Sequence, residues 1–155
     1  MSLKSQIRSD LTAAMKAKDS DTTATLRMVL AAIQTAEVAG KEAHELSDDE
    51  TVKVLQKESK KRAEAAEVFA DNGRAELAAK EQAEAAIIDR YLPTPLSDDE
   101  LTTLAAQAVS DVTAQLGEAP TMKQMGQVMA AATKAAEGRA DGKRLSAAVR
   151  AALSA

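Results

Sequence analysis

The most informative segment of this 155-residue chain is Tyr91-Leu92-Pro93-Thr94-Pro95-Leu96-Ser97-Asp98-Asp99-Glu100. Its prolines lack a backbone N–H and restrict the residues before them to extended geometry, so a helix must end there. Ser97 and Glu100 then match a capping box, in which each side chain accepts from the other residue's backbone N–H. The segment therefore predicts a helix ending near Tyr91, a linker over 93–96 and a new helix after Ser97.

The pentapeptide Leu-Ser-Asp-Asp-Glu also occurs at 46–50, where it predicts another helix start. The residues that follow the two copies differ, so we interpret them as one cap used twice and not as a domain repeat. The helix after the first copy is stopped by Asp71-Asn72-Gly73, and a further helix runs from about 74 to 91. These two helices predict a long helical hairpin. Apolar spacing predicts two earlier helices, through Leu3, Ile7 and Leu11 and through 26–33.

Downstream of the linker, the pattern predicts three short helices over 98–116, 122–136 and 142–154. We expect Met122, Met125 and Met129 to fill the core of this bundle, and Gly126 to allow close approach of a neighbouring helix backbone. The predicted fold is all-α. It has an N-terminal helical domain (1–92) with a long hairpin, a proline-containing linker (93–96) and a small three-helix domain (97–155).

The composition excludes several classes of protein. Alanine supplies 35 of the residues, about half of the 45% hydrophobic fraction, and aromatic residues make up 1%. Large β-sandwiches and doubly wound sheets draw on β-branched and aromatic residues that are scarce here. Cysteine is absent, which excludes disulfides and thiolate chemistry. No apolar run reaches the ~18 residues that a membrane span needs, and no secretory signal is evident. We expect a cytoplasmic protein, a monomer with no membrane association.

The charge distribution points to the C-terminal end. The net charge is −4, but residues 121–155 carry +4 and residues 1–120 carry −8. An anionic partner should therefore meet the C-terminal end first. The candidate nucleic-acid-binding residues are Lys123, Lys134, Arg139, Lys143 and Arg144.

The segment Glu137–Arg144 permits two interpretations. In the structural one, Gly138 ends one helix in a left-handed conformation and Asp141 caps the next, which begins at Gly142. In the functional one, free backbone N–H groups at the start of the last helix and the adjacent basic side chains bind phosphate. The sequence leaves both open.

A second basic stripe lies on the first arm of the hairpin and comprises Lys53, Lys57, Lys60 and Lys61. Either it contacts phosphates, or it is a solvated face neutralised by hairpin carboxylates, namely Glu64, Glu67, Glu81 and Glu84; the solvated face is the more common outcome for such stripes. His44, the single histidine, lies in a polar loop without an evident catalytic partner. No phosphate-binding glycine loop is present, and we expect no cofactor, no metal and no catalytic residue.

Five segments are informative through their order and spacing: Leu26–Ile33, Leu55–Glu58, Tyr91–Pro93, Met125–Met129 and Gly138–Gly142. Together they resemble the YqeY family, and the resemblance covers essentially the whole chain. The C-terminal part is also similar to the tail of the GatB subunit of tRNA-dependent amidotransferases. This resemblance implies an all-helical protein in two parts, whose C-terminal domain is of the kind associated with tRNA binding.

Three functional hypotheses follow. The leading one is a noncatalytic accessory module that binds tRNA or a tRNA-charging enzyme, an aminoacyl-tRNA synthetase or an amidotransferase, through the basic C-terminal domain. The second is a subunit that supports carbon–nitrogen ligase activity with glutamine as amide donor; the resemblance implies this label through the tail alone, and the catalytic portion of GatB has no counterpart in these residues. The third is a protein–protein adaptor that uses the helical hairpin.

Overall fold

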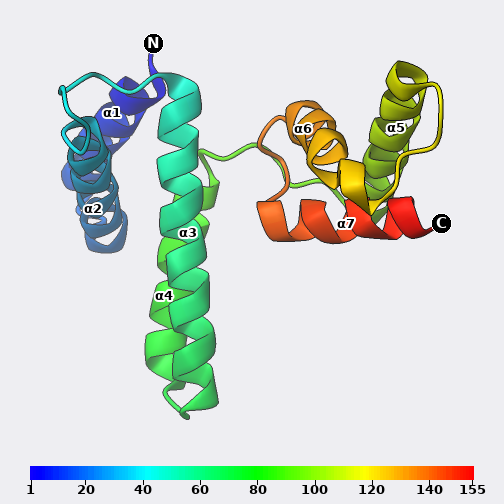
Figure 1. The fold of residues 1–155 in the computed structure, drawn as a ribbon. Helices are drawn as coiled ribbons and strands as arrows, with labels where there is room; N and C mark the ends of the chain where they lie inside the picture. Colours follow the sequence, from blue (N-terminus) through cyan, green and yellow to red (C-terminus); the bar gives the residue numbers. More distant parts are fainter. The chain divides into compact units, whose positions relative to one another are not determined.

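A computed structural model describes all residues from 1 to 155, and it consists of helices and connecting loops without strands (Figure 1). The predicted all-α fold is confirmed. The chain forms two compact units, Met1–Leu92 and Pro93–Ala155. Each unit has its own hydrophobic core, because the buried apolar residues fall into two separate clusters.

The N-terminal unit contains four helices: α1 (Leu3–Lys16), α2 (Ser20–Glu37), α3 (Asp48–Asp71) and α4 (Ala75–Asp89). Within this unit, α1 and α2 pack against one half of the α3–α4 hairpin, and the other half extends past them (Figure 1). The core is formed by the apolar faces that the sequence spacing predicts. Its buried residues are Ile7, Leu26, Val29, Ile33, Leu55, Ile87 and Ile88.

The outer half of the hairpin is held together by small side chains. Ala66, Ala78 and Ala85 are buried between α3 and α4, so the two helices approach closely without a large apolar core. Gly73, with a φ of +73°, lies in the turn where α3 ends, as the Asp71-Asn72-Gly73 sequence predicts. Alanine suits this arrangement because it has the highest helix propensity and occupies little volume.

A buried arginine lies in the hairpin. The Arg62 side chain is 4% exposed, and its Nη1 donates to Glu58 Oε2 at 2.7 Å. Its Nε lies 3.3 Å from Glu84 Oε2 of α4, an ionic contact without hydrogen-bond geometry. Glu58 and Arg62 form an i,i+4 pair along α3, and Glu84 extends this pair to the second arm. This cluster therefore ties the two arms together where they have few large apolar side chains.

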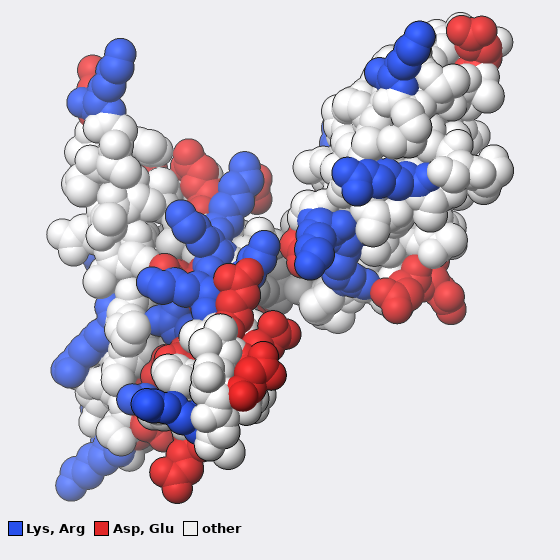
Figure 2. Space-filling model, turned by 60° about the horizontal axis from the view of Figure 1, so that its bottom comes forward, with Lys and Arg blue, Asp and Glu red and all other residues white.

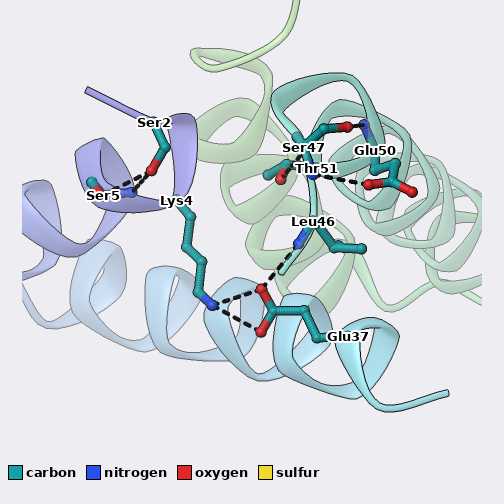
Figure 3. Close-up of polar contacts among 8 residues, drawn as sticks. All are labelled: Ser2, Lys4, Ser5, Glu37, Leu46, Ser47, Glu50 and Thr51. Carbon is teal, nitrogen blue, oxygen red and sulfur yellow. Dashed lines mark hydrogen bonds and ion pairs between the residues drawn. The ribbon is translucent and has the colours of Figure 1, made fainter. Parts of the chain in front are cut away.

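A carboxylate cluster fixes the start of α3 (Figure 3). Lys4 Nζ of α1 donates to both carboxylate oxygens of Glu37 at 2.7 and 2.8 Å, and Leu46 N donates to Glu37 Oε1 at 3.3 Å. Next to it, Ser47 and Glu50 form the predicted capping box. The end of α2, the start of α1 and the first turn of α3 are thus joined through charged and polar contacts.

This cluster predicts an acid-sensitive stabilisation. Hydrogen bonds from Lys4 hold the pKa of Glu37 below its ordinary value of 4.5. Because the folded pKa is the lower one, the ion pair stabilises the fold above pH 4.5, and its contribution is lost as the pH falls through the folded pKa. We expect Lys4→Met to lower the Tm at pH 7, and we expect this difference from the wild type to shrink as the pH falls below 4.5. Thermal melts between pH 3 and 7 measure this, with Lys16→Met as the exposed control on α1. A Tm difference that does not change with pH would contradict the assignment.

The C-terminal unit contains α5 (Asp98–Leu116), a short 3₁₀ helix η1 (Met122–Gln124), α6 (Met125–Ala136) and α7 (Gly142–Ser154). Three of its helices enclose a core of ten buried residues: Leu96, Leu101, Ala105, Ala108, Val112, Val128, Ala132, Ala136, Leu145 and Val149. The predicted cap at Ser97 is present, since Ser97 N donates to Glu100 Oε2 at 2.8 Å and Glu100 N donates to Ser97 Oγ at 3.1 Å. Leu96, within the predicted linker, belongs to this core.

Two predictions for the segment 122–126 are wrong. Met122 is 53% exposed, because it lies in the separate 3₁₀ turn η1, and only Met125 and Met129 pack on the core. Gly126 is exposed, and a Cβ built on it would contact nothing within 4 Å. The backbone of a neighbouring helix therefore does not require glycine at that position.

Candidate nucleic-acid interface

The turn between α6 and α7 combines structural and basic residues. Glu137 and Gly138 both have left-handed backbones, with φ values of +50° and +77°, and they end α6. Asp141 caps α7, where its Oδ1 accepts from Arg144 N at 2.8 Å. The structural roles expected for Gly138 and Asp141 are confirmed. The Asp141 carboxylate occupies the helix start, so a phosphate bound there would meet a like charge.

Arg139 and Arg144 hold the proline-containing segment against this turn. Arg139 Nε donates to the Thr94 carbonyl at 2.8 Å, and its own carbonyl accepts from Leu96 N at 2.8 Å. Arg144 Nη2 donates to the Leu96 carbonyl at 2.8 Å and to Asp98 Oδ1 at 3.1 Å. An extended segment leaves its backbone groups without helical partners, and these contacts satisfy several of them. Both arginines thus have structural partners, although their side chains stay 37% and 35% exposed.

The lysines of the C-terminal unit are free of such contacts. Lys123 in η1, Lys134 in the last turn of α6 and Lys143 in the first turn of α7 are exposed and make no side-chain hydrogen bond or ion pair. Arg150 of α7 shares this property, and it was not among the sequence candidates although it contributes to the basic charge of 121–155. On the face of this unit drawn in Figure 2, Lys and Arg side chains are separated by uncharged surface. The cations are accessible but dispersed.

The C-terminal unit has a groove with an acidic lining. In the C-terminal unit, a groove of about 450 Å³ is lined by Asp99, Glu100, Thr103, Leu104 and Gln107, and its acidic lining disfavours phosphate. No group of three or more Asp, Glu, His or Cys side chains lies close enough to hold a metal ion. None of the helices is both long and apolar enough to cross a membrane. The loop residue His44 is exposed, with Nε2 3.4 Å from Glu50 Oε1.

The basic stripe on α3 belongs to the N-terminal unit. Lys53, Lys57, Lys60 and Lys61 are all exposed, and none of them forms an ion pair. The neutralisation expected from hairpin carboxylates is not present. Glu84 instead contacts the buried Arg62.

Comparison with known proteins assigns the family. The family model described as Yqey-like protein matches residues 4–153. The chain belongs to the YqeY family. This YqeY-family chain is also 37% identical over 124 residues to "Altered inheritance of mitochondria protein 41, mitochondrial" of Meyerozyma guilliermondii. The match covers 79% of the present chain but 64% of that relative's length. Neither match concerns the GatB tail, so that resemblance stays a prediction.

The segments that carry the YqeY resemblance have identifiable structural roles. Leu26, Val29 and Ile33 of α2 form core contacts, and Leu55 lies in the same core. The Tyr91 hydroxyl donates to Asp10 Oδ2 of α1, which fastens the chain just before the prolines, and burial raises the pKa of Tyr91 above its ordinary value of 10.0. These YqeY-family segments are therefore explained by packing and by helix termination.

Proposed function

We propose that this YqeY-family protein is a noncatalytic module that binds tRNA through the cations of its C-terminal unit. The observation that supports this proposal is that Lys123, Lys134 and Lys143 are exposed and have no carboxylate partner. Unpaired cations in water gain free energy when they displace counterions from a phosphate backbone. Arg139 and Arg144 contribute less than the sequence suggests, because binding phosphate would compete with their carbonyl and carboxylate contacts.

The composition of this unit supports a particular mode of binding. Phe69 and Tyr91 are the two aromatic residues of the chain, and both lie in the N-terminal unit. Sequence-specific RNA recognition depends largely on bases stacked on aromatic side chains. The C-terminal unit should therefore bind phosphates with little preference for sequence. We also propose that the protein is located in the cytoplasm. The relative is mitochondrial by name, so microscopy of a fluorescently tagged chain is needed to distinguish the two compartments.

The proposal predicts a salt-dependent association that three lysines control. Each phosphate contact contributes about 0.7–0.9 to the slope of log affinity against log salt concentration. We expect the triple variant Lys123→Gln/Lys134→Gln/Lys143→Gln to lower that slope by about 2–3 and to bind tRNA more weakly at 50 mM salt. Fluorescence anisotropy with labelled tRNA at 50 and 200 mM salt measures both quantities. The matched control is Lys16→Gln/Lys41→Gln/Lys80→Gln, which removes the same charge from exposed sites of the N-terminal unit.

Two results would reject the proposal. One is the absence of tRNA association by the wild type at 50 mM salt, and the other is equal binding by the triple variant and its control. A third measurement tests whether the protein is noncatalytic. Amide formation by the purified chain from Glu-tRNA, glutamine and ATP would instead support the amidotransferase-like alternative.

A further inference from the structure

The α3 lysine stripe, defined as Lys53, Lys57, Lys60 and Lys61, is an unusually uncompensated surface. The four residues lie within nine positions of one helix and span about 12 Å at 1.5 Å per residue. At i, i+4, i+7 and i+8 they share one side of the helix. All four are exposed, and no carboxylate lies within ion-pair distance of any of them.

The packing of the hairpin explains why the stripe has no partners. The buried residues of α3 are Thr51, Leu55, Arg62 and Ala66, so the side of the helix that meets the rest of the unit is opposite to the lysines. Carboxylates on α4 cannot reach across the helix. Glu58 and Glu84 are 19% and 16% exposed because Arg62 holds both of them. The buried arginine therefore holds Glu58, the one carboxylate between 53 and 61, away from the lysines.

The acidic residues at the two ends of the stripe do not neutralise it either. Glu50 accepts from Ser47 N at 2.8 Å in the capping box and also contacts His44. Asp49 precedes Lys53 by four residues and Glu64 follows Lys60 by four, yet neither carboxylate forms an ion pair with a lysine of the stripe. Between these ends, every charged residue on the exposed side of α3 is a lysine.

The surroundings of the stripe indicate the chemistry of its partner. No large apolar side chain is exposed between 53 and 61, and the nearest one along the helix is Val68. Protein interfaces and inserted membrane helices rely on buried apolar or aromatic anchors. A phosphate backbone requires only accessible cations at intervals along its path. Lysine, a flexible point charge, suits such contacts better than base recognition.

We propose that the α3 lysine stripe is a second phosphate-binding surface, which binds the backbone of RNA without reading its sequence. It lies in the N-terminal unit and does not depend on the C-terminal cations. Four contacts would contribute about 2.8–3.6 to the slope of log affinity against log salt. Raising salt from 50 to 200 mM would then weaken the stripe's contribution by about 50- to 150-fold.

The test uses the full chain and a mixed-sequence duplex RNA. The variant Lys53→Gln/Lys57→Gln/Lys60→Gln/Lys61→Gln removes the stripe with a helix-compatible amide. The matched control, Lys16→Gln/Lys18→Gln/Lys41→Gln/Lys80→Gln, removes the same charge from other exposed sites of the N-terminal unit. We expect the stripe variant to bind RNA at least tenfold more weakly than the wild type at 50 mM salt. The slope of its log affinity against log salt concentration should also be smaller by about 3, and both changes should be far smaller in the control. Circular dichroism checks that both variants keep their helix content.

Several outcomes would overturn the inference. Equal RNA binding by the stripe variant and its control would do so, as would tighter binding of the wild type to a poly-glutamate peptide or to anionic vesicles than to RNA. The C-terminal triple variant separates this proposal from the preceding one. If that variant loses binding and the stripe variant does not, the C-terminal surface stands and the stripe fails; the reverse result supports the stripe alone.

Discussion

Arg62→Ala is expected to destabilise the N-terminal unit by about 3 kcal/mol, since removing one partner of a buried pair costs about 3–5 kcal/mol and the remaining carboxylates keep some exposure. The substitution leaves Glu58 and Glu84 beside each other without the cation that holds them. It also removes the aliphatic stem of a side chain that is 4% exposed. Urea unfolding followed by circular dichroism measures the loss of unfolding free energy.

Two comparisons make this expectation specific. Lys61→Ala, at the adjacent exposed position, should change stability by no more than about 0.5 kcal/mol. Combining Arg62→Met with Glu58→Gln and Glu84→Gln should recover most of the loss, because a buried ionic cluster can often be replaced by neutral groups of similar volume. If Arg62→Ala and Lys61→Ala behaved alike, the cluster would have no role in holding the hairpin.

Leu145→Ala is expected to cost the C-terminal unit about 2–5 kcal/mol, the range for truncating a buried leucine. Leu145 is 2% exposed, and the ten-residue core around it contains three leucines, three valines and four alanines. A core of this size supplies only about 3–5 kcal/mol of net stability. The single substitution should therefore unfold most of this unit.

Nuclear magnetic resonance can measure separately whether each of the two units is folded in the Leu145→Ala variant. Amide signals of residues 93–155 should collapse to random-coil positions, while those of 1–92 keep their dispersion, because the two cores share no residues. Leu116→Ala provides the matched control, since Leu116 is 40% exposed. Unfolding of both units together would show that their stabilities are coupled, contrary to this expectation.

Local chemistry explains why much of the fold could be predicted. The capping boxes at Ser47 and Ser97 act over three residues, so they are visible in sequence and the structure confirms both. Gly73 and Asp141 likewise act within a turn or two. Met122 shows the limit of this reasoning: its spacing matched a core position, but a 3₁₀ turn altered the side on which it lies.

The candidate sites were harder to predict than the fold, because the sequence shows which residues are basic but not which groups they contact. Arg139 and Arg144 were grouped with the lysines, yet they bind carbonyl groups of 94–96, more than 40 residues earlier. The i,i+4 spacing of Glu58 and Arg62 is typical of a surface ion pair, whereas the burial of Arg62 against α4 depends on which side of α3 the hairpin covers. Arg150 could have been selected by counting basic residues on α7.

The amino-acid sequence alone was sufficient for the helical class and for several helix limits, because caps, prolines and apolar periodicity act over a few residues. The tertiary structure was needed to separate cations with partners from free ones. Burial of Arg62 draws Glu58 and Glu84 away from the surface, and the α6–α7 turn engages Arg139 and Arg144. Such pairing depends on contacts between residues distant in sequence, where desolvation and geometry, and not residue type, determine whether a charge is available to a ligand.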